Sequence, residues 1–483
     1  MITFFISIVL LIIGYFTYGK YIDRMFGLKN DRPTPAYEQN DGVDYLPMNT
    51  RTNSLIQLLN IAGVGPIFGP IMGALYGPVA FIWIVVGSIF AGAVHDYLTG
   101  MISIRNKGAH LPALASKFLG NGMKHVVNLF TVLLLLLVGT VFVTSPAILL
   151  HSLMDGRVAL GVIIGVIFLY YILSTVLPID KIIGKIYPFF GAVLLFSAFA
   201  IGFRLVQTGA PIPELSLSNM HPDNAPIFPL LFFTITCGAL SGFHATQSPI
   251  ISRTTQRESN GRMIFYGMMI AEGIIAMIWA AAAMSLFDGY GGLAEVLAAG
   301  EAALVVSEAS TLLLGSALGT IAVLGVIVLP ITSGDTAFRS ARMVVADYLS
   351  FTQGELWKRF AIAVPMFVIS FVLTQIDFTI LWRYFSWANQ MTAVIALWVG
   401  VMYLLLAKKN HWVATVPAVF MTFNVITYIL YAQIGLGLEL NIAYAGGVAG
   451  TIIWMIYFYR VYKKTVGQEG FLIDYQIPAK TEA

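Results

Sequence analysis

The hydrophobic positions of the chain form long apolar runs that short polar stretches separate. A bilayer core of about 30 Å needs about 20 mostly apolar residues in one helix. Measured against that length, the runs predict about thirteen membrane-spanning helices. These predicted spans lie near residues 2–19, 54–77, 79–104, 124–151, 158–177, 183–206, 227–250, 263–286, 310–334, 359–376, 382–406, 412–434 and 441–462.

Two boundaries in this pattern need interpretation. Only Gly77 and Pro78 separate the second apolar run from the third, and we interpret them as a tight turn, because the joined runs are too long for one span. The first run resembles a signal peptide in position. It lacks a preceding positive residue and a following small-x-small cleavage site, so we expect a retained helix.

Composition excludes several functional classes. Of 483 residues, 58% are apolar and 11% charged, whereas a soluble domain carries about 25% charged residues. A soluble enzyme, a nucleic-acid binder and a disordered scaffold are therefore excluded. One cysteine excludes a disulfide framework and an all-cysteine metal site. The zinc-protease, Walker and Gly-x-Ser-x-Gly motifs are missing, so we expect an all-α, polytopic membrane protein that is not an enzyme.

The basic residues predict how the chain crosses the membrane. Of the 27 Lys and Arg residues, 24 follow odd-numbered spans and three follow even-numbered spans. Because cytoplasmic loops carry the excess of Lys and Arg, this split predicts an outer N-terminus and a cytoplasmic C-terminus in the cell membrane. The predicted loop at 287–309 carries acidic residues and no base, and we expect it outside.

Glycine and proline interrupt the second span. Gly63, Gly65 and Pro66 stand together, and Pro70 follows one turn later. Proline removes a backbone donor and clashes with the preceding turn, and glycine makes unwinding easy. In a membrane, freed backbone groups must line a cavity or find a partner. We therefore predict a break near 62–66 that forms part of a binding site, with a simple kink as the alternative.

The seventh span is also interrupted, because Gly, Ser, His, Thr, Gln and Pro crowd residues 238–249. By the predicted topology, the second and seventh spans run in opposite directions. Two interrupted helices that lie five spans apart and run in opposite directions predict a five-plus-five inverted repeat. The predicted parts are an extra helix at 1–22, a cytoplasmic linker or gate at 23–53, repeats at 54–208 and 227–407, two helices at 411–464 and a cytoplasmic tail at 465–483.

The two breaks supply the candidate substrate site. Half-helix N-termini there present free N–H groups that suit a carboxylate. A lone histidine such as His244 has a second interpretation, as a hydrogen-bonded core residue. The candidate substrate-binding residues are Asn60, Gly63, Gly65, Pro66, Gly238, Ser241, Gly242, His244, Gln247 and Asn389.

Ionisable residues at membrane depth are costly and indicate function. Asp96 lies in the third span and Glu272 in the eighth. Either carboxylate is a candidate partner for a substrate ammonium group. The alternatives are a buried pair of Asp96 with a base such as Arg105 or Lys107, and a structural hydrogen bond for Glu272.

The ninth span ends in a cluster of oxygen-bearing side chains, Thr332, Ser333, Asp335 and Thr336. Such oxygens suit a hard cation such as Na⁺. Asp335 or Asp96 is able to carry a proton instead, and the sequence leaves Na⁺ and H⁺ both open. The alternative for Asp335 is a pair with Arg339 one turn on. We expect no other metal and no other cofactor.

Seven stretches between residues 33 and 390 resemble the carbon starvation protein A family of peptide and pyruvate transporters. They are Pro33–Ala36, Asp41–Pro47, Ile61–Pro70, Ala91–Asp96, Cys237–His244, Thr332–Arg339 and Trp387–Gln390. The chain departs from the family's usual pattern in two places. His95 stands before Asp96 where the family pattern has a glutamine, and the C-terminal part of the chain is shorter.

The resemblance implies a cytoplasmic-membrane secondary carrier with the five-plus-five inverted-repeat fold that amino-acid and sodium-coupled carriers share. In such carriers a cation site often lies between the first core helix and hydroxyl groups of the eighth. Carried over to this chain, that site would use the backbone of Gly63 and Val64 with the side chains of Thr332, Ser333 and Thr336.

These observations together predict ion-coupled uptake, by alternating access, of a small carboxylate-bearing nutrient: a short peptide, an amino acid or pyruvate. The alternatives are a passive channel or facilitator, and a transporter-like nutrient sensor that acts through residues 20–53. The expected partners are this small molecule and the lipid bilayer, with no nucleic acid. The glycine pairs 161/165 and 446/450 are able to pack helices in an oligomer.

Overall fold

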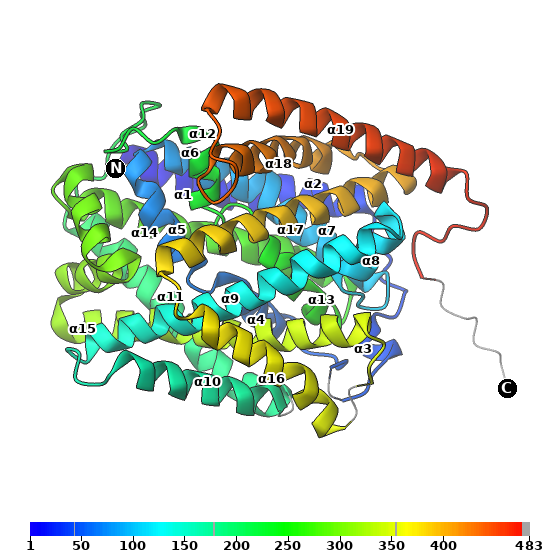
Figure 1. Cartoon of the computed structure of the whole chain (residues 1–483), viewed down its shortest axis with the longest axis horizontal. Helices are drawn as coiled ribbons and strands as arrows, with labels where there is room; N and C mark the ends of the chain where they lie inside the picture. The colour runs from blue at the N-terminus through cyan, green and yellow to red at the C-terminus, as the bar shows by residue number, and fades with distance from the viewer. Residues whose placement is uncertain (43, 177–178, 353–354, 476–483) are drawn as a thin grey trace.

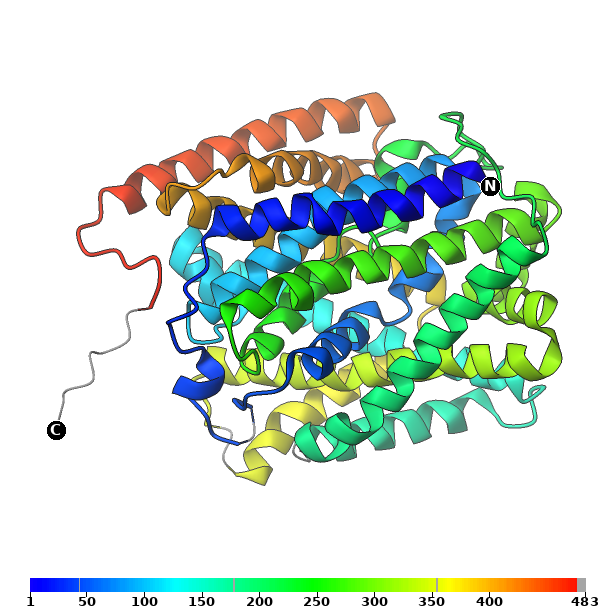
Figure 2. The ribbon, with the colours of Figure 1, turned by 180° about the vertical axis from the view of Figure 1, so that it is seen from behind.

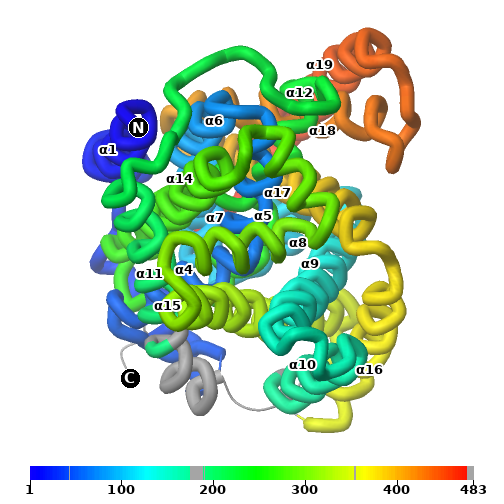
Figure 3. The backbone as a smooth tube through the Cα atoms, turned by 90° about the vertical axis from the view of Figure 1, so that its left-hand side faces the viewer, coloured from blue at the N-terminus to red at the C-terminus, as the bar shows by residue number. Residues whose placement is uncertain are grey.

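The computed structural model describes residues 1–475 apart from 43, 177–178 and 353–354. In the described chain the long helices run close to the long axis of the molecule (Figure 1), and the view from behind shows the same alignment (Figure 2). The end-on view shows them gathered around a centre that α4, α5, α7 and α14 occupy (Figure 3). The fold is therefore an all-helical bundle.

The helices of the first half are α1 (Ile2–Phe16), α2 (Tyr18–Phe26), α3 (Pro35–Glu38), α4 (Thr50–Ala62), α5 (Gly65–Gly73), α6 (Val79–Val86), α7 (Ala93–Ile104), α8 (Leu111–Leu119), α9 (Met123–Leu153), α10 (Leu160–Val176) and α11 (Ile179–Gln207). The second half contains α12 (Ile227–Thr234), α13 (Gly242–Ser252), α14 (Met268–Leu286), α15 (Gly289–Tyr348), α16 (Leu356–Leu373), α17 (Phe378–Leu406), α18 (Trp412–Tyr431) and α19 (Leu440–Val466). Short 3₁₀ or π segments join several of them, at Ala74–Tyr76, Gly87–Gly92, Glu258–Asn260 and Arg262–Gly267.

The apolar helices confirm a multi-pass membrane protein. Among the described residues, nine helical stretches are long and apolar enough to cross a membrane, and α4 with α5 forms a tenth that bends by 46°. Two shorter apolar helices, Leu160–Ser174 and Gly191–Gln207, lie on two further predicted spans. The α12–α13 pair lies on the seventh. The total of thirteen and the inverted repeat stay predictions.

The break in the second span is confirmed. Between α4 and α5, Gly63 has φ +49°, and a Cβ there would lie 2.2 Å from the ring of Phe142. Only glycine fits this position. Pro66 stands in the first turn of α5, where a backbone N–H has no partner within the helix, so the missing N–H of proline costs no helical hydrogen bond. Gly77, with φ +79°, makes the predicted tight turn before α6.

The seventh span is interrupted as predicted. Residues 235–241 are not helical, and Gly238 has φ +85°. This stretch packs against the first break, because a Cβ on Gly65 would lie 2.3 Å from Cys237 Sγ. A Cβ on Gly238 would lie 2.4 Å from Ala276 of α14. The two breaks therefore meet in the middle of the bundle, beside α14.

The segment at 287–309 is helical from residue 289, so the predicted loop is wrong, while its position outside the membrane stays a prediction. It belongs to α15, which non-helical backbone at Gly300, Glu301 and Gly315 divides into three pieces. The segment is rich in Ala, Leu and Glu, which favour helix. Its apolar side is buried, with Leu293 and Val305 fully covered.

The N- and C-terminal segments lie at opposite ends of the bundle (Figures 1 and 2). At the N-terminal end, the Met1 amine donates to Glu214 Oε1 at 2.5 Å, which ties α1 to the 208–226 segment. At the other end, residues 27–42 and 44–48, which we call the end strap, cross the ends of α7 and α13. Thr34 Oγ1 donates to Thr255 O at 2.6 Å, and Met48 N donates to Thr254 O at 3.0 Å.

Candidate functional site

A chain of buried ionisable side chains joins α7, α13 and α14. His95 Nδ1 lies 2.8 Å from Asp96 Oδ1, and His244 Nδ1 lies 2.9 Å from Asp96 Oδ2. The other nitrogen, His244 Nε2, lies 3.4 Å from Glu272 Oε2. All four side chains are 0% or 1% exposed. Three of the four, Asp96, His244 and Glu272, are residues that the sequence singled out, and the structure brings them together.

The alternative that paired Asp96 with Arg105 or Lys107 is wrong. Arg105 Nε and Nη2 donate to the two carboxylate oxygens of Glu258 at 3.0 and 2.8 Å. Its remaining N–H groups reach Tyr403 and Gly27. Arg105 is therefore engaged at the end of α7, and the histidines are the partners of Asp96.

Cys237 joins the buried chain at its Glu272 end. One ligand atom each from Cys237, His244 and Glu272 lies within 4.8 Å of the other two. Cys237 Sγ also donates to Ser241 Oγ at 3.3 Å. Thiolate, imidazole and carboxylate are ligands for a borderline metal such as Zn²⁺, so this group has the donor chemistry of a metal site. The sequence analysis assigned no role to Cys237.

Asn389 of α17 connects to the start of α13. Its Oδ1 accepts a hydrogen bond from Phe243 N at 2.7 Å and another from Ser241 Oγ at 3.1 Å. A Cβ on Gly242 would lie 2.1 Å from the Asn389 carbonyl oxygen. Asn389 therefore caps the half-helix. The expectation of a free N–H at this end is wrong for Phe243.

Two other predicted substrate residues present acceptors that the described residues leave unpartnered. Asn60 Oδ1, in the last turn of α4, and Gln247 Oε1, in α13, are buried and make no hydrogen bond there. Gln247 Nε2 donates to Thr246 Oγ1 at 2.9 Å. Pro66 packs beside Gly238, at the contact between the two breaks.

The hydroxyl groups of α15 lie beside α4, as the predicted cation site requires, but the candidate ligands form hydrogen bonds within the protein. Ser333 Oγ donates to Leu59 O at 2.7 Å, one turn before the break. The backbone of Val64 is used within α5, because Phe68 N donates to Val64 O at 2.8 Å. The hydroxyls of Thr332 and Thr336 donate to carbonyl groups of α15 itself.

Asp335 lies between α15 and α10. Its Oδ1 accepts a hydrogen bond from Ser174 Oγ at 2.8 Å. Arg339 Nη2 lies 4.0 Å from the same oxygen and donates to Ser174 O at 2.9 Å. The structure therefore contains the Asp335–Arg339 pair that the sequence offered as an alternative.

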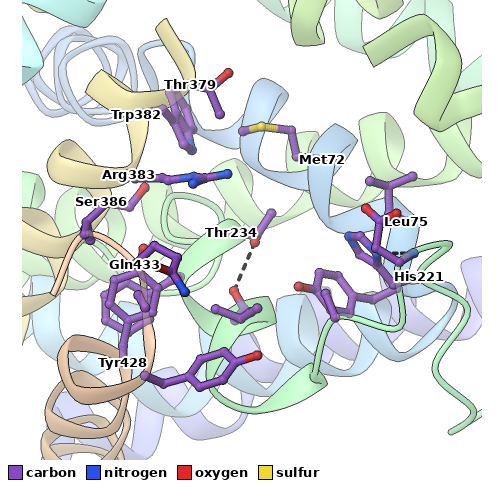
Figure 4. Close-up of a pocket in the computed structure, with 18 of the residues that line it drawn as sticks. Met72, Leu75, His221, Thr234, Thr379, Trp382, Arg383, Ser386, Tyr428 and Gln433 are labelled. Carbon is purple, nitrogen blue, oxygen red and sulfur yellow. Dashed lines mark hydrogen bonds between the residues drawn. The ribbon is translucent and has the colours of Figure 1, made fainter. Parts of the chain in front are cut away.

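A cavity of about 840 Å³ opens at the N-terminal end of the bundle. It is lined by α5, α12, α15, α17 and α18 and by loops near residues 221–225 and 432–439. Figure 4 shows Arg383 reaching from α17 into this space, with Trp382 and Ser386 beside it and Thr234 facing it. None of the predicted substrate-binding or cation-binding residues lines this cavity.

Comparison with known families gives a match to the model described as "Carbon starvation protein CstA", over residues 1–221, 160–291 and 285–428. The chain belongs to the CstA family. An uncharacterized membrane protein of Haemophilus influenzae is 47% identical over 352 residues, which are 62% of this CstA chain and 95% of that protein.

Two relatives carry functional names. The peptide transporter CstA of Bacillus subtilis is 24% identical over 522 residues, covering 85% of this chain and 86% of the relative. The pyruvate/proton symporter BtsT of Escherichia coli is 28% identical over 355 residues, covering 59% and 49%. The match to BtsT therefore spans about half of that longer protein.

A solved membrane transporter shares the fold of this CstA-family protein. A histidine-to-alanine mutant of the manganese transporter of Eremococcus coleocola matches with a TM-score of 0.58. The match covers 86% of this chain and 95% of the transporter, at 12% identity. At this identity the likeness shows the fold.

The α17 residues of the cavity were not predicted from the sequence. Arg383 did carry a signal in the sequence, because it lies in the second turn of α17, at the start of a predicted apolar span and on the side where basic residues are rare. Trp382 and Ser386 gave no signal, since tryptophan and serine are ordinary residues of a membrane helix. His95 gave a signal as a departure from the family pattern, and it contacts Asp96.

Proposed function

We propose that this CstA-family protein is a secondary active transporter that imports a small carboxylate-bearing nutrient by proton-coupled alternating access. The observation that carries the proposal is the buried contact of His244 with Asp96 and Glu272. It connects the half-helix α13 to two continuous helices, α7 and α14. Ionisable groups at membrane depth are retained chiefly for function, and proton relays are a common one.

The chemistry of imidazole explains how a proton would act here. A neutral imidazole has one N–H and donates to one partner, whereas the protonated ring donates through both nitrogens. His244 lies between two carboxylates, 2.9 Å from one and 3.4 Å from the other. Uptake of a proton would therefore strengthen the second contact and change how α13 is held against α14. Such a change links proton binding to the position of a broken helix.

A proton fits the described contacts better than Na⁺. Two candidate sodium ligands already have other partners, since the Ser333 hydroxyl donates to the Leu59 carbonyl and the Val64 carbonyl accepts from Phe68 N. The named relative BtsT is a pyruvate/proton symporter, and this supports the same coupling ion here. No cofactor beyond the coupling ion enters the proposal.

The substrate class and orientation follow from separate observations. Named relatives are a peptide transporter and a pyruvate symporter, and both kinds of substrate carry a carboxylate. The distribution of Lys and Arg supports a cell-membrane protein with an outer N-terminus. The 840 Å³ cavity then opens to the outside, from which an imported nutrient arrives.

Uptake into proteoliposomes tests the proposal. Labelled pyruvate and labelled L-alanyl-L-alanine are offered separately, with an imposed H⁺ or Na⁺ gradient. We expect accumulation of at least one of them when the proton gradient points inward. His244→Gln should abolish accumulation and keep exchange across the membrane, while Glu295→Gln, on the exposed side of α15, serves as the matched control.

Each other outcome contradicts a named part of the proposal. Flux that never exceeds equilibrium would indicate a passive channel or facilitator. Binding without flux would indicate a sensor. Accumulation that follows the Na⁺ gradient alone would refute proton coupling and return attention to Ser333 and Thr332.

A further inference from the structure

Arg383 differs from the other basic residues assigned to the outer side of the membrane, Arg157 and Arg204. Arg204 Nε donates to Leu313 O at 2.8 Å, and Arg157 lies 3.8 Å from Asp155 in its own loop. Within the part of the chain that the structure describes, Arg383 forms no hydrogen bond and no ion pair. Its side chain extends into the outer cavity (Figure 4). A cation held in this way is available to an anionic ligand.

Two further donors on α17 line the same cavity. Trp382 is 5% exposed and Ser386 is 2% exposed. Neither Trp382 Nε1 nor Ser386 Oγ has a hydrogen-bond partner among the described residues. Buried donors without a partner are rare in proteins, because the lost hydrogen bond to water is not replaced. Together with Arg383 they form a group of donors that face one space and lack acceptors.

The same face of α17 leads from the cavity to the broken helix. Trp382 and Ser386 are four residues apart, and Arg383, Ser386 and Asn389 follow at intervals of three, so these side chains lie towards the same side of the helix. Asn389 binds the start of α13. Arg383 and Asn389 are six residues apart, which is about 9 Å along a helix. A ligand at Arg383 therefore lies close to the moving part of the proposed transporter.

We propose that this face of α17 is an outer carboxylate site that binds the substrate before it reaches the breaks. The Arg383 guanidinium, the Trp382 indole N–H and the Ser386 hydroxyl donate to the carboxylate. This inference rests on the proposed function, and it adds the residues that recognise the substrate's acid group. The sequence assigned none of them.

The charges around the cavity also select among carboxylates. Asp223, Glu301 and Glu439 line it together with Arg383. Glu301 Oε1 accepts a hydrogen bond from Thr379 Oγ1 at 2.8 Å, which holds this carboxylate at the start of α17. A ligand with a carboxylate at one end and an ammonium group at the other complements this mixed lining. The site therefore suits a short peptide or an amino acid better than pyruvate, which lacks the cation.

Binding to the purified, full-length protein in detergent tests the site without requiring transport. The probes are L-alanyl-L-alanine and its C-terminal amide, which keeps the ammonium group and lacks the carboxylate. Calorimetry measures Kd for each. Arg383→Gln should raise the Kd of the dipeptide by about 10- to 100-fold, the range for a lost hydrogen bond to a charged group, and leave the amide unchanged. Arg157→Gln removes an outer charge away from the cavity and should change neither.

The remaining variants separate recognition from folding. Trp382→Phe keeps an aromatic ring beside Phe68 and removes only the N–H, and Ser386→Ala removes only the hydroxyl. Each should weaken dipeptide binding by up to about 10-fold. The inference is overturned if Arg383→Gln and Ser386→Ala bind the dipeptide with the wild-type Kd. It is also overturned if the dipeptide and its amide lose affinity equally.

Failure of the proposed function has a different signature. Suppose that the wild-type protein binds the dipeptide in detergent and that Arg383→Gln weakens this binding as expected. If the wild-type protein then shows no concentrative uptake in proteoliposomes, transport is refuted and the site is retained. Wild-type uptake whose KM is the same in Arg383→Gln would retain transport and refute the site.

Discussion

Glu258→Gln removes one half of a buried ion pair at the end of the molecule opposite the cavity around Arg383. The pair is bidentate, with Arg105 Nε and Nη2 at 3.0 and 2.8 Å from the two carboxylate oxygens. The two side chains are 5% and 1% exposed. Breaking such a pair by removing one partner costs about 3–5 kcal/mol, because the other charge stays buried. Arg105 keeps its bonds to Tyr403 and Gly27, so we expect the lower end of that range, about 3 kcal/mol.

Chemical unfolding of the purified protein in detergent, followed by tryptophan fluorescence, measures this loss. The double variant Arg105→Met, Glu258→Met is the matched control. It removes both charges, and it should lose less stability than Glu258→Gln alone, because no buried charge is left unpaired. A Glu258→Gln protein within about 0.5 kcal/mol of wild type would refute the reasoning, since that is the contribution of an exposed pair.

Three further predictions concern single sites. Burial lowers the pKa of His110, and the nearby Arg253 adds to the shift, so neutral His110 stabilises the fold above about pH 6.5 and this stability is lost as the pH falls through the lowered pKa. In the same unfolding assay, His110→Gln should therefore lose less stability than wild type between pH 7 and pH 5. Parallel curves of stability against pH would contradict this. Asn389→Ala removes the acceptor for Phe243 N and Ser241 Oγ and should lower the free energy of unfolding by about 1–3 kcal/mol. Asn389→Asp keeps an acceptor at a helix N-terminus and should lower it less. Equal losses in the two variants would exclude the capping role. Gly63→Ala places a Cβ 2.2 Å from Phe142 at φ +49° and should lower the free energy of unfolding by at least about 2 kcal/mol. Gly65→Ala crowds Cys237 at a negative φ, so comparing the two variants separates crowding from backbone strain. A Gly63→Ala protein as stable as wild type would show that the break is not held as described.

Local chemistry explains why much of this fold was predictable from sequence. Apolar run length fixes where a helix is able to cross a membrane, and the runs at 79–104, 124–151 and 382–406 coincide with observed helices. The break at Gly63 was predictable because glycine and proline act on their own backbone. The 287–309 segment was not, since the absence of a long apolar run says nothing against a helix that packs on the protein surface.

Long-range pairing was beyond the sequence. Asp96 and His244 are 148 positions apart and meet only because α7 and α13 pack together. The sequence offered a nearby base such as Arg105 as an alternative partner of Asp96, yet Glu258, from a distant segment, pairs with that arginine. The cavity around Arg383 draws on residues from 72 to 439, so its shape depends on the whole packing arrangement. Its residues carry no shared local motif.

The end strap has a consequence for the speed of the proposed cycle. In the proposed transport cycle, substrate release at that end would require several contacts to break together. They are the bonds of Thr34 and Met48 to the end of α13, the Arg105–Glu258 pair, and the bond from Tyr475 N to Arg105 O. Conformational steps limit turnover in many proteins, and each 1.36 kcal/mol of barrier slows a step about tenfold. Contacts that stabilise the resting protein would then slow each release of substrate. A variant with a loosened strap would unfold at lower denaturant and yet turn over faster, with a weaker dependence of its rate on temperature.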